Sequence, residues 1–343
     1  MAARHTPERR GSGRRVWLRV LIYGFLLAGL TGGVSCMIRM PGRSHGGPLP
    51  PLTPEQHELG DRLRAHVRRL AGEIGERNVW EYGNLVAAAA WIEEELRSLD
   101  FEVRTQPFDA EGRRVRNLEV ERRGTGRAGE ILVVGAHYDS VLGSPGANDN
   151  ASGVAALLEL ARAFSGRPAA RTVRFVAFVN EEPPFFQTGQ MGSLVYARRA
   201  RAADERIIAM LSLETIGCYV DDPGSQRYPF PIGLFYPRRG DFIGFVGNIG
   251  SRALVRQVVG AFRRHAAFPS QGAAVPGGLV GIGWSDHWAF WQQGYHAAMV
   301  TDTALFRYPH YHLRSDTPDR LDYGRLARVV SGLVRVIDEL ANP

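Results

Sequence analysis

EILVVGAHYDS, residues 130–140, is the segment on which the fold assignment rests. Its apolar run is too short for a helix and is typical of a strand that is buried on both faces. Apolar runs of similar length follow in TVRFVAFVN at 172–180, IIAMLSLE at 207–214 and HAAMVTDT at 296–303, with helical patterns between them. This alternation predicts a single α/β domain with a mostly parallel central sheet and helices on both faces.

The other expected elements fit around these strands. FEVRTQPF at 101–108 and VRNLEVERR at 115–123 alternate apolar and polar side chains like an antiparallel pair. A further strand is expected in PIGLFY at 231–236. Apolar residues at helical spacing predict helices over the ranges 55–77, 84–98, 151–164, 189–203, 250–265, 286–293 and 322–341.

The net charge of the 343-residue chain is +7, and it is concentrated at the N-terminus. Residues 1–43 hold eight arginines and one acid, so the other 300 residues are formally neutral. A domain that binds nucleic acid would carry its basic excess on the folded part, so we expect no nucleic-acid partner. Two cysteines, Cys36 and Cys218, are too few for a disulfide framework or a thiolate metal site.

Residues 20–38, VLIYGFLLAGLTGGVSCMI, contain no charge and are about as long as a membrane-spanning helix. The arginines ahead of them predict a single-pass signal-anchor, with the basic tail 1–19 in the cytoplasm and the rest of the chain on the other side of the membrane. A cleaved signal peptide, which releases a secreted protein, is the alternative. Residues 39–54 read as a Pro/Gly linker and residues 55–343 as the folded domain.

Imidazole and carboxylate groups stand where several predicted strands end. His137 and Asp139 follow the first of these strands, Glu181 and Glu182 the second, and Glu214 the third. The carboxyl ends of parallel strands meet at one edge of a sheet, where the active sites of such proteins lie. Carboxylates gathered there repel one another unless cations neutralise them. A mixed imidazole and carboxylate set without thiolates suits divalent metal ions, zinc first.

Other candidate groups come from the intervening segments. Asp149 precedes the helix 151–164, Asp302 ends a strand, and His312 lies in the loop that follows. Taken singly, Asp149 fits a helix N-cap, and His312 fits a surface histidine. Taken together with the acids of the other strand ends, these residues favour a metal site.

Five motifs, in this order, resemble those of the co-catalytic zinc aminopeptidases of metallopeptidase family twenty-eight, which also includes glutamate carboxypeptidases and is similar to the glutaminyl cyclases. The motifs are AHYDS at 136–140, GANDNASGVAALLELAR at 146–162, VNEEPPFF at 179–186, SDHWAF at 285–290 and YHLRSDTPD at 311–319. The resemblance spans about residues 55–341. It implies a three-layer α/β/α sandwich around a mixed sheet of about eight strands, and it makes residues 55–343 a zinc peptidase catalytic domain.

The resemblance also implies two zinc ions. His137 and Glu214 would bind one metal, Glu182 and His312 the other, and Asp149 would bridge both. Many members have aspartate where this chain has Glu214. The longer side chain still reaches a metal, but it changes the expected geometry of that site. Cobalt and manganese are alternative metals.

The implied catalytic residues are Glu181, Asp139 and Tyr311. Glu181 matches the general base, Asp139 the acid that orients His137, and Tyr311 a phenol near the substrate carbonyl. The expected reaction is the removal of N-terminal residues from peptide substrates. Two alternatives stay open: a glutaminyl-cyclase-like acyltransferase with one zinc, and a catalytically silent receptor or binding ectodomain. Residue specificity and oligomeric state are left undetermined.

Overall fold

The computed structural model describes residues 17–19, 21, 23, 25, 32, 33, 35–230 and 232–343. The chain divides into two units, Met1–Arg39 and Met40–Pro343. The predicted membrane span 20–38 lies largely outside the described residues. Within the described part, none of the helices is long and apolar enough to cross a membrane.

Unit Met40–Pro343 is built on one mixed eight-stranded sheet in the order β1-β2-β4-β3-β5-β8-β6-β7. Strands β4, β3, β5 and β8 run parallel to one another, as the apolar runs predicted. Strand β6 pairs antiparallel with β8, and β1 and β2 form the expected antiparallel pair. The strands are β1 Arg104–Ala110, β2 Arg113–Arg122, β3 Arg127–His137, β4 Arg171–Phe178, β5 Ile207–Glu214, β6 Ile243–Asn248, β7 Ser270–Val275 and β8 Ala297–Thr301.

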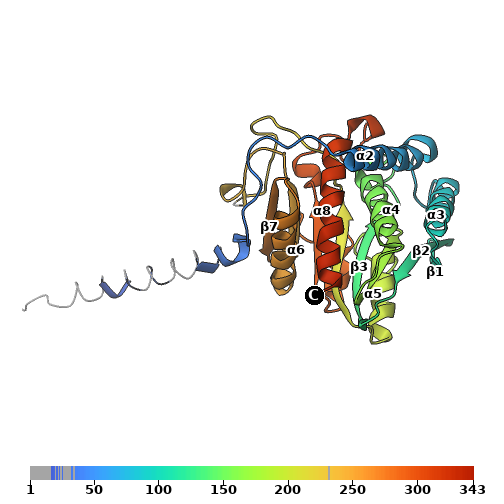
Figure 1. Ribbon diagram of the computed structural model, residues 1–343, viewed down its shortest axis with the longest axis horizontal. Coiled ribbons are helices and arrows are strands. Elements are labelled where there is room, and N and C mark those ends of the chain that lie inside the picture. The colour runs from blue at the N-terminus through green and yellow to red at the C-terminus, as the bar shows by residue number, and fades with distance from the viewer. Residues whose placement is uncertain are drawn as a thin grey trace, which may run out of the picture. The chain divides into compact units, whose positions relative to one another are not determined.

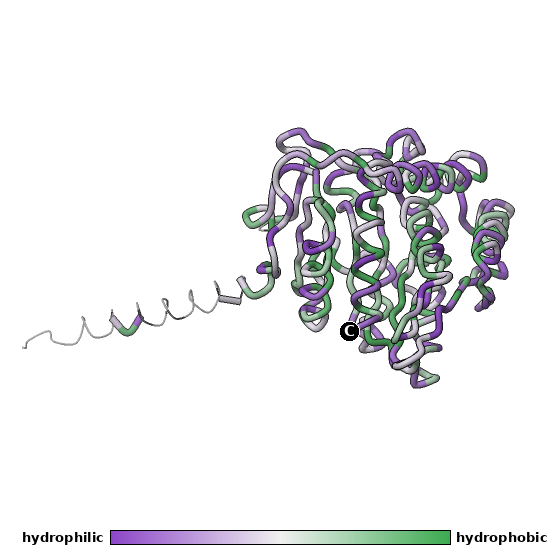
Figure 2. The backbone as a smooth tube through the Cα atoms, viewed as in Figure 1, coloured by the Kyte–Doolittle hydropathy of each residue, from purple (hydrophilic) through white to green (hydrophobic). Residues whose placement is uncertain are grey.

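Helices cover both faces of the sheet (Figure 1). Alternate side chains of β3 belong to different cores: Leu132 and Val134 pack with α2, α3, α4, α6 and α8, whereas Ile131 and Val133 pack with α5 and α7. The predicted α/β/α sandwich is therefore confirmed, and Figure 2 shows hydrophobic residues recurring along its central elements. The helices are α2 Pro54–Val67, α3 Tyr82–Arg97, α4 Gly153–Phe164, α5 Gly192–Ala202, α6 Arg252–His265, α7 His287–Gln292 and α8 Tyr323–Ala341.

The strand predicted at 231–236 is wrong, and two real strands escaped prediction. Residues Ile232–Leu234 form a short 3-10 helix, and Leu234 is exposed. Strands β6, IGFVGN, and β7, SQGAAV, are short and rich in small residues, so their apolar signal is weak. They nevertheless pair over six residues, at the edge of the sheet.

The Pro/Gly-rich residues that precede α2 lie against the domain instead of hanging free. The guanidinium of Arg263 in α6 donates hydrogen bonds to the carbonyls of Pro41 and Gly42, both at 3.1 Å. Leu49 packs against the core, and Arg328 donates to the carbonyl of Pro50. The segment has no regular structure because proline and glycine favour neither helix nor strand, but it is bound to the domain near both of its ends.

Two glycines of β3 provide a matched test of the core. A Cβ at Gly135 would stand 2.3 Å from Cε2 of the buried Phe178, whereas a Cβ at Gly129 meets no atom within 4 Å. We expect Gly135→Ala to lower the free energy of unfolding by about 1–3 kcal/mol, because the aromatic ring must move within a packed core. Gly129→Ala should change it by less than about 0.5 kcal/mol. Denaturant unfolding measures both; equal effects would contradict the packing described.

Candidate metal centre

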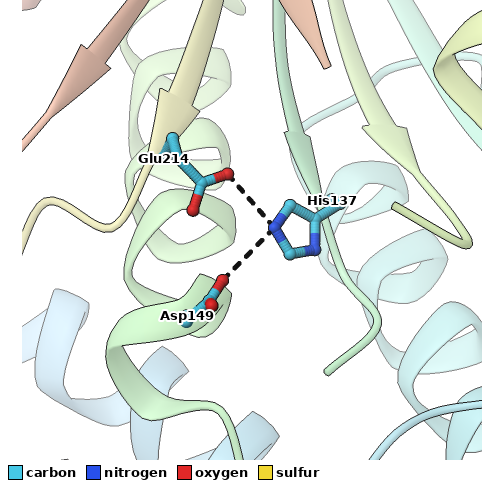
Figure 3. A group of neighbouring side chains, drawn as sticks. All are labelled: His137, Asp149 and Glu214. Carbon is cyan, nitrogen blue, oxygen red and sulfur yellow. Dashed lines mark ion pairs between the residues drawn. The ribbon is translucent and has the colours of Figure 1, made fainter. Parts of the chain in front are cut away.

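Five side chains form two groups that share one carboxylate. His137, Asp149 and Glu214 make the first group (Figure 3), and Asp149, Glu182 and His312 make the second; within each group the ligand atoms lie within 4.8 Å of one another. Nε2 of His137 is 3.4 Å from Oδ1 of Asp149 and 3.2 Å from Oε2 of Glu214. Nε2 of His312 is 3.1 Å from the other Asp149 oxygen, Oδ2, and 3.3 Å from Oε2 of Glu182.

The sheet delivers these groups to one edge. His137 and Glu214 are the last residues of β3 and β5, and Glu182 follows β4. These strands are parallel, so their carboxyl ends coincide. Asp149 lies in the π-helical turn Ala147–Ser152 ahead of α4, and His312 lies in the loop after β8.

Asp139 joins two parts of the site. Its Oδ1 is 3.5 Å from Nδ1 of His137, and its backbone oxygen lies 3.2 Å from the same nitrogen. Its carboxylate also accepts hydrogen bonds from the backbone N–H groups of Glu181, at 3.2 Å, and Glu182, at 3.1 Å. One buried acid therefore orients an imidazole and the turn that carries two glutamates.

Glu181 lies beside the first group but outside it. Its Oε2 is 3.8 Å from Nε2 of His137, and its side chain is buried. Burial and the neighbouring carboxylates of Glu214, Glu182 and Asp286 raise the pKa of Glu181 well above its ordinary value, against the opposing effect of His137. A carboxylate with a raised pKa beside a metal site is suited to accept and release a proton.

The pKa values of the group members reflect charge crowding. Burial and the nearby Asp149 raise the pKa of Glu182 to about 8. Burial lowers the pKa of His312, but the close carboxylates of Asp149 and Glu182 outweigh it and raise that pKa to about 10. Each imidazole is thus favoured in its protonated form, because a positive charge is needed between these carboxylates.

Unpartnered atoms show that the groups fit a metal. Nε2 of His137, Nε2 of His312 and Oε1 of Glu182 are buried, and none has a hydrogen-bond partner among the described residues. Buried polar atoms seldom lack a partner without a functional reason. All three belong to the two groups, and imidazole nitrogen with carboxylate oxygen is a donor set for zinc.

Asp316 supports the shared carboxylate and was missed as a site residue. Its two oxygens accept the backbone N–H groups of Asn148, at 2.8 Å, and Asp149, at 3.1 Å. The side-chain amide of Asn148 in turn donates to Asp302 at 2.9 Å, so the acid that follows β8 helps to hold the turn that carries Asp149. Asp316 lies four residues after His312, within the motif YHLRSDTPD at 311–319, and its place in that motif could have identified it as a site residue.

Arg77 is a buried support that no sequence signal distinguished from a surface arginine. Its side chain is fully buried and donates hydrogen bonds to the backbone carbonyls of Leu70, Gly75, Tyr138, Pro145 and Gly146. Tyr138 separates His137 from Asp139, and Gly146 begins the turn that carries Asp149. One guanidinium therefore ties together the segments on either side of the shared site.

Three site segments have backbone in the left-handed region. Asn180, which precedes Glu181, has φ 61°, Thr215, which follows Glu214, has φ 44°, and His312 itself has φ 61°. This conformation is unfavourable for a β-branched residue such as Thr215, so the surrounding contacts must hold it.

Tyr311 lies over the second group. Its ring stacks on that of His312, with centroids 3.8 Å apart and planes at 18°. Burial and the nearby carboxylates of Asp149 and Glu182 raise the pKa of its phenol well above the ordinary value. The phenol is therefore neutral near neutral pH and is able to donate a hydrogen bond.

Comparison with known proteins points to a single family. The profile of Peptidase family M28 matches residues 117–337, a range that includes both candidate metal-binding groups. The uncharacterized protein YfbL of Escherichia coli is 39% identical over 297 residues, which cover 84% of this chain and 90% of YfbL. Leucine aminopeptidase 1 of Arthroderma otae is 26% identical over 63% of this chain, and the match spans only 56% of that relative.

Solved structures share the fold. The zinc aminopeptidase BSAP of Bacillus subtilis superposes with a TM-score of 0.66 at 16% identity, covering 82% of this chain and 95% of BSAP. The glutaminyl cyclase of Fimbriiglobus ruber superposes with a TM-score of 0.61 at 22% identity, covering 86% of this chain and 97% of the cyclase. At such identities the likeness describes the architecture and not the reaction.

Arg77 and Arg69 provide a matched pair for testing the buried support. Arg77→Met removes the donor of five backbone carbonyl oxygens, three of them in buried hydrogen bonds, and each buried loss costs about 1–3 kcal/mol. We expect the free energy of unfolding to fall by more than about 3 kcal/mol. Arg69→Met removes an arginine whose side chain is 46% exposed and pairs with Glu73, so it should cost less than about 1 kcal/mol. Denaturant unfolding compares the two; a small effect of Arg77→Met would contradict this role.

Proposed function

The chain belongs to Peptidase family M28 and is a zinc metallopeptidase, and from this we propose that it is an aminopeptidase with two zinc ions. The observation that carries the proposal is the position of Asp149. Its two carboxylate oxygens face different imidazoles, at 3.4 Å and 3.1 Å. A carboxylate placed in this way is suited to bridge two cations. A site with a single metal ion would leave the second imidazole without a metal to bind.

The two groups supply the proposed ligands. His137 and Glu214 would hold one zinc, Glu182 and His312 the other, and Asp149 both. Ser285 Oγ donates to Oε2 of Glu214 at 2.7 Å, which fixes the longer side chain found at this position. Zinc supplies a water of lowered pKa and an electrophile that polarises the peptide carbonyl.

Glu181 is proposed as the general base. Its raised pKa and its position beside the first group suit a carboxylate that takes a proton from water and passes it to the leaving amine. Asp139 holds the Glu181 backbone and the His137 ring, so that base and ligand keep their relative placement. The phenol of Tyr311 is assigned to the substrate carbonyl as a hydrogen-bond donor.

Peptides with a free N-terminus are the proposed substrates. A relative with 26% identity is named leucine aminopeptidase, which supports this reading. The alternative, cyclisation of N-terminal glutamine, is favoured only by the shared fold of a glutaminyl cyclase. We further propose that residues 20–38 anchor the chain in a membrane, with the catalytic domain outside the cytoplasm; secretion after cleavage is the alternative. The uncharged composition and the preceding arginines support it.

Glu181→Gln tests the general base. The variant keeps the size of the side chain but cannot take a proton, so we expect turnover of aminoacyl-anilides to fall at least about 100-fold. Zinc content should be unchanged, because Glu181 is not a proposed ligand. Glu94→Gln, an exposed position on α3, is the matched control and should keep full activity. Undiminished turnover of the Glu181 variant would reject the assignment.

Metal counting tests the two-zinc site. Elemental analysis of the zinc-saturated protein should give two ions per chain. His312→Phe should remove one ion and leave the other, whereas Asp149→Ala should weaken both, because Asp149 belongs to both groups. One ion in the unmodified protein, together with cyclisation of N-terminal glutamine, would establish the single-zinc alternative.

A further inference from the structure

We propose that residues 228–230 and 232–239, here called the aromatic loop, insert into the surface of a lipid bilayer and hold the catalytic domain against it. This proposal rests on the membrane anchor proposed above, but it does not depend on the peptidase reaction. It assigns an interaction surface to a segment that takes no part in the metal centre.

The tip of the aromatic loop is apolar and exposed. The side chains of Phe230, Leu234 and Phe235 are 89%, 73% and 46% exposed. Arg238 and Arg239, three and four residues after Phe235, are also exposed. Large apolar side chains beside arginine are typical of segments that enter the boundary between lipid head groups and acyl chains.

The base of the aromatic loop is well attached, so the exposed tip is held in place. Tyr228 Oη donates to the carbonyl of Pro237 at 2.7 Å, and Tyr236 Oη donates to the carbonyl of Gly272 in β7 at 2.8 Å. The rings of Tyr228 and Tyr236 lie 5.9 Å apart. A fixed base means that little conformational entropy is lost when the tip enters a bilayer.

The aromatic loop and the first residues of the folded unit contact the same part of β7. Gly272, which accepts the Tyr236 hydroxyl, is also covered by Met40: a Cβ at position 272 would stand 2.8 Å from Met40 Cγ. The backbone N–H of Ser270 donates to Ser44 Oγ at 2.8 Å, so the segment continues along β7 (Figure 1). Met40 follows the proposed anchor by two residues.

The segment that follows the proposed anchor is bound to the domain from residue 40 onward. A free linker of residues 39–54 would reach about 50 Å when extended, enough to lift the domain clear of the membrane. The hydrogen bonds from Arg263 to Pro41 and Gly42 fix that segment to α6 instead. The proposed anchor therefore ends two residues before Met40, which lies on Gly272 of β7, the strand that also accepts the Tyr236 hydroxyl of the aromatic loop.

Apolar insertion outweighs charge in this contact. Arg227, Arg238 and Arg239 are balanced by the acids Asp221, Asp222 and Asp241, of which Asp221 pairs with Arg325. The net charge left to attract anionic lipid is small, whereas three large apolar side chains are available to leave water. The contact should therefore persist at high salt, which screens only the charged part.

The test uses the full chain in vesicles of phosphatidylcholine and phosphatidylglycerol. In a Cys36→Ser background, in which the remaining Cys218 is buried, a fluorophore is attached at Leu234→Cys or, as control, at Val86→Cys on α3. Val86 is 39% exposed and lies beside the opposite edge of the sheet. We expect lipids with brominated acyl chains to quench the label at 234 at least twofold, in low salt and in 1 M NaCl, and to leave the label at 86 unchanged.

The outcomes separate the loop from the anchor and from the enzyme. Chain that floats with vesicles but shows no quenching at 234 overturns the proposal while the anchor stands. A label at 234 that is shielded from aqueous iodide yet not quenched by brominated lipid means that a protein, such as a second copy, covers the loop; this also overturns it. If the chain does not float with vesicles, both the proposed anchor and the proposed membrane contact are wrong. Zinc-dependent turnover then still tests the proposed peptidase reaction, because that reaction does not depend on the membrane.

Discussion

Repulsion among buried carboxylates is the constraint that organises this protein. Asp149, Glu181, Glu182 and Glu214 lie at one edge of the sheet with little access to water, where like charges interact strongly. The raised pKa values of the three glutamates show that the chain alone does not neutralise them. Two imidazoles supply part of the missing positive charge, but Nε2 of each ring has no hydrogen-bond partner among the described residues. A pair of divalent cations would neutralise the carboxylates and provide partners for these nitrogen atoms. The fold therefore brings together groups that are stable side by side when metal ions are bound.

The supports of the site act on backbone more than on side chains. Arg77 binds five carbonyl oxygens, Asp316 two N–H groups ahead of Asp149, and Asp139 two N–H groups at the glutamate turn. Holding backbone in this way fixes several ligands at once, and it tolerates the left-handed conformations found at Asn180, Thr215 and His312. The charge of each support also matters: a buried arginine behind a cluster of acids lowers their mutual repulsion without occupying a ligand position.

Much of the fold and of the candidate site could be predicted because both depend on strand ends. An apolar run such as residues 130–137 predicts a buried strand, and the polar residues that follow the run must then lie at the edge of the sheet. Glu214 was found in this way. Arg77 was not, because its role depends on contacts with residues up to 69 positions away, which no local pattern records. Strands β6 and β7 were missed because small residues carry little periodicity, and the segment 20–38 was named but lies mostly outside the described residues.

The two halves of the site are unequal, and the difference follows from the elements that carry them. His137 ends a central strand and is completely buried, so its position is set by the sheet itself. His312 lies in a loop with its side chain 30% exposed and its backbone in the left-handed region, supported by the stacked ring of Tyr311. The sheet therefore positions His137 and Glu214 of the first group, whereas in the second group His312 is the side chain that reaches solvent. Under the proposed function, a peptide would approach from the side of His312 and Tyr311, and this one loop would provide both a metal ligand and a substrate contact.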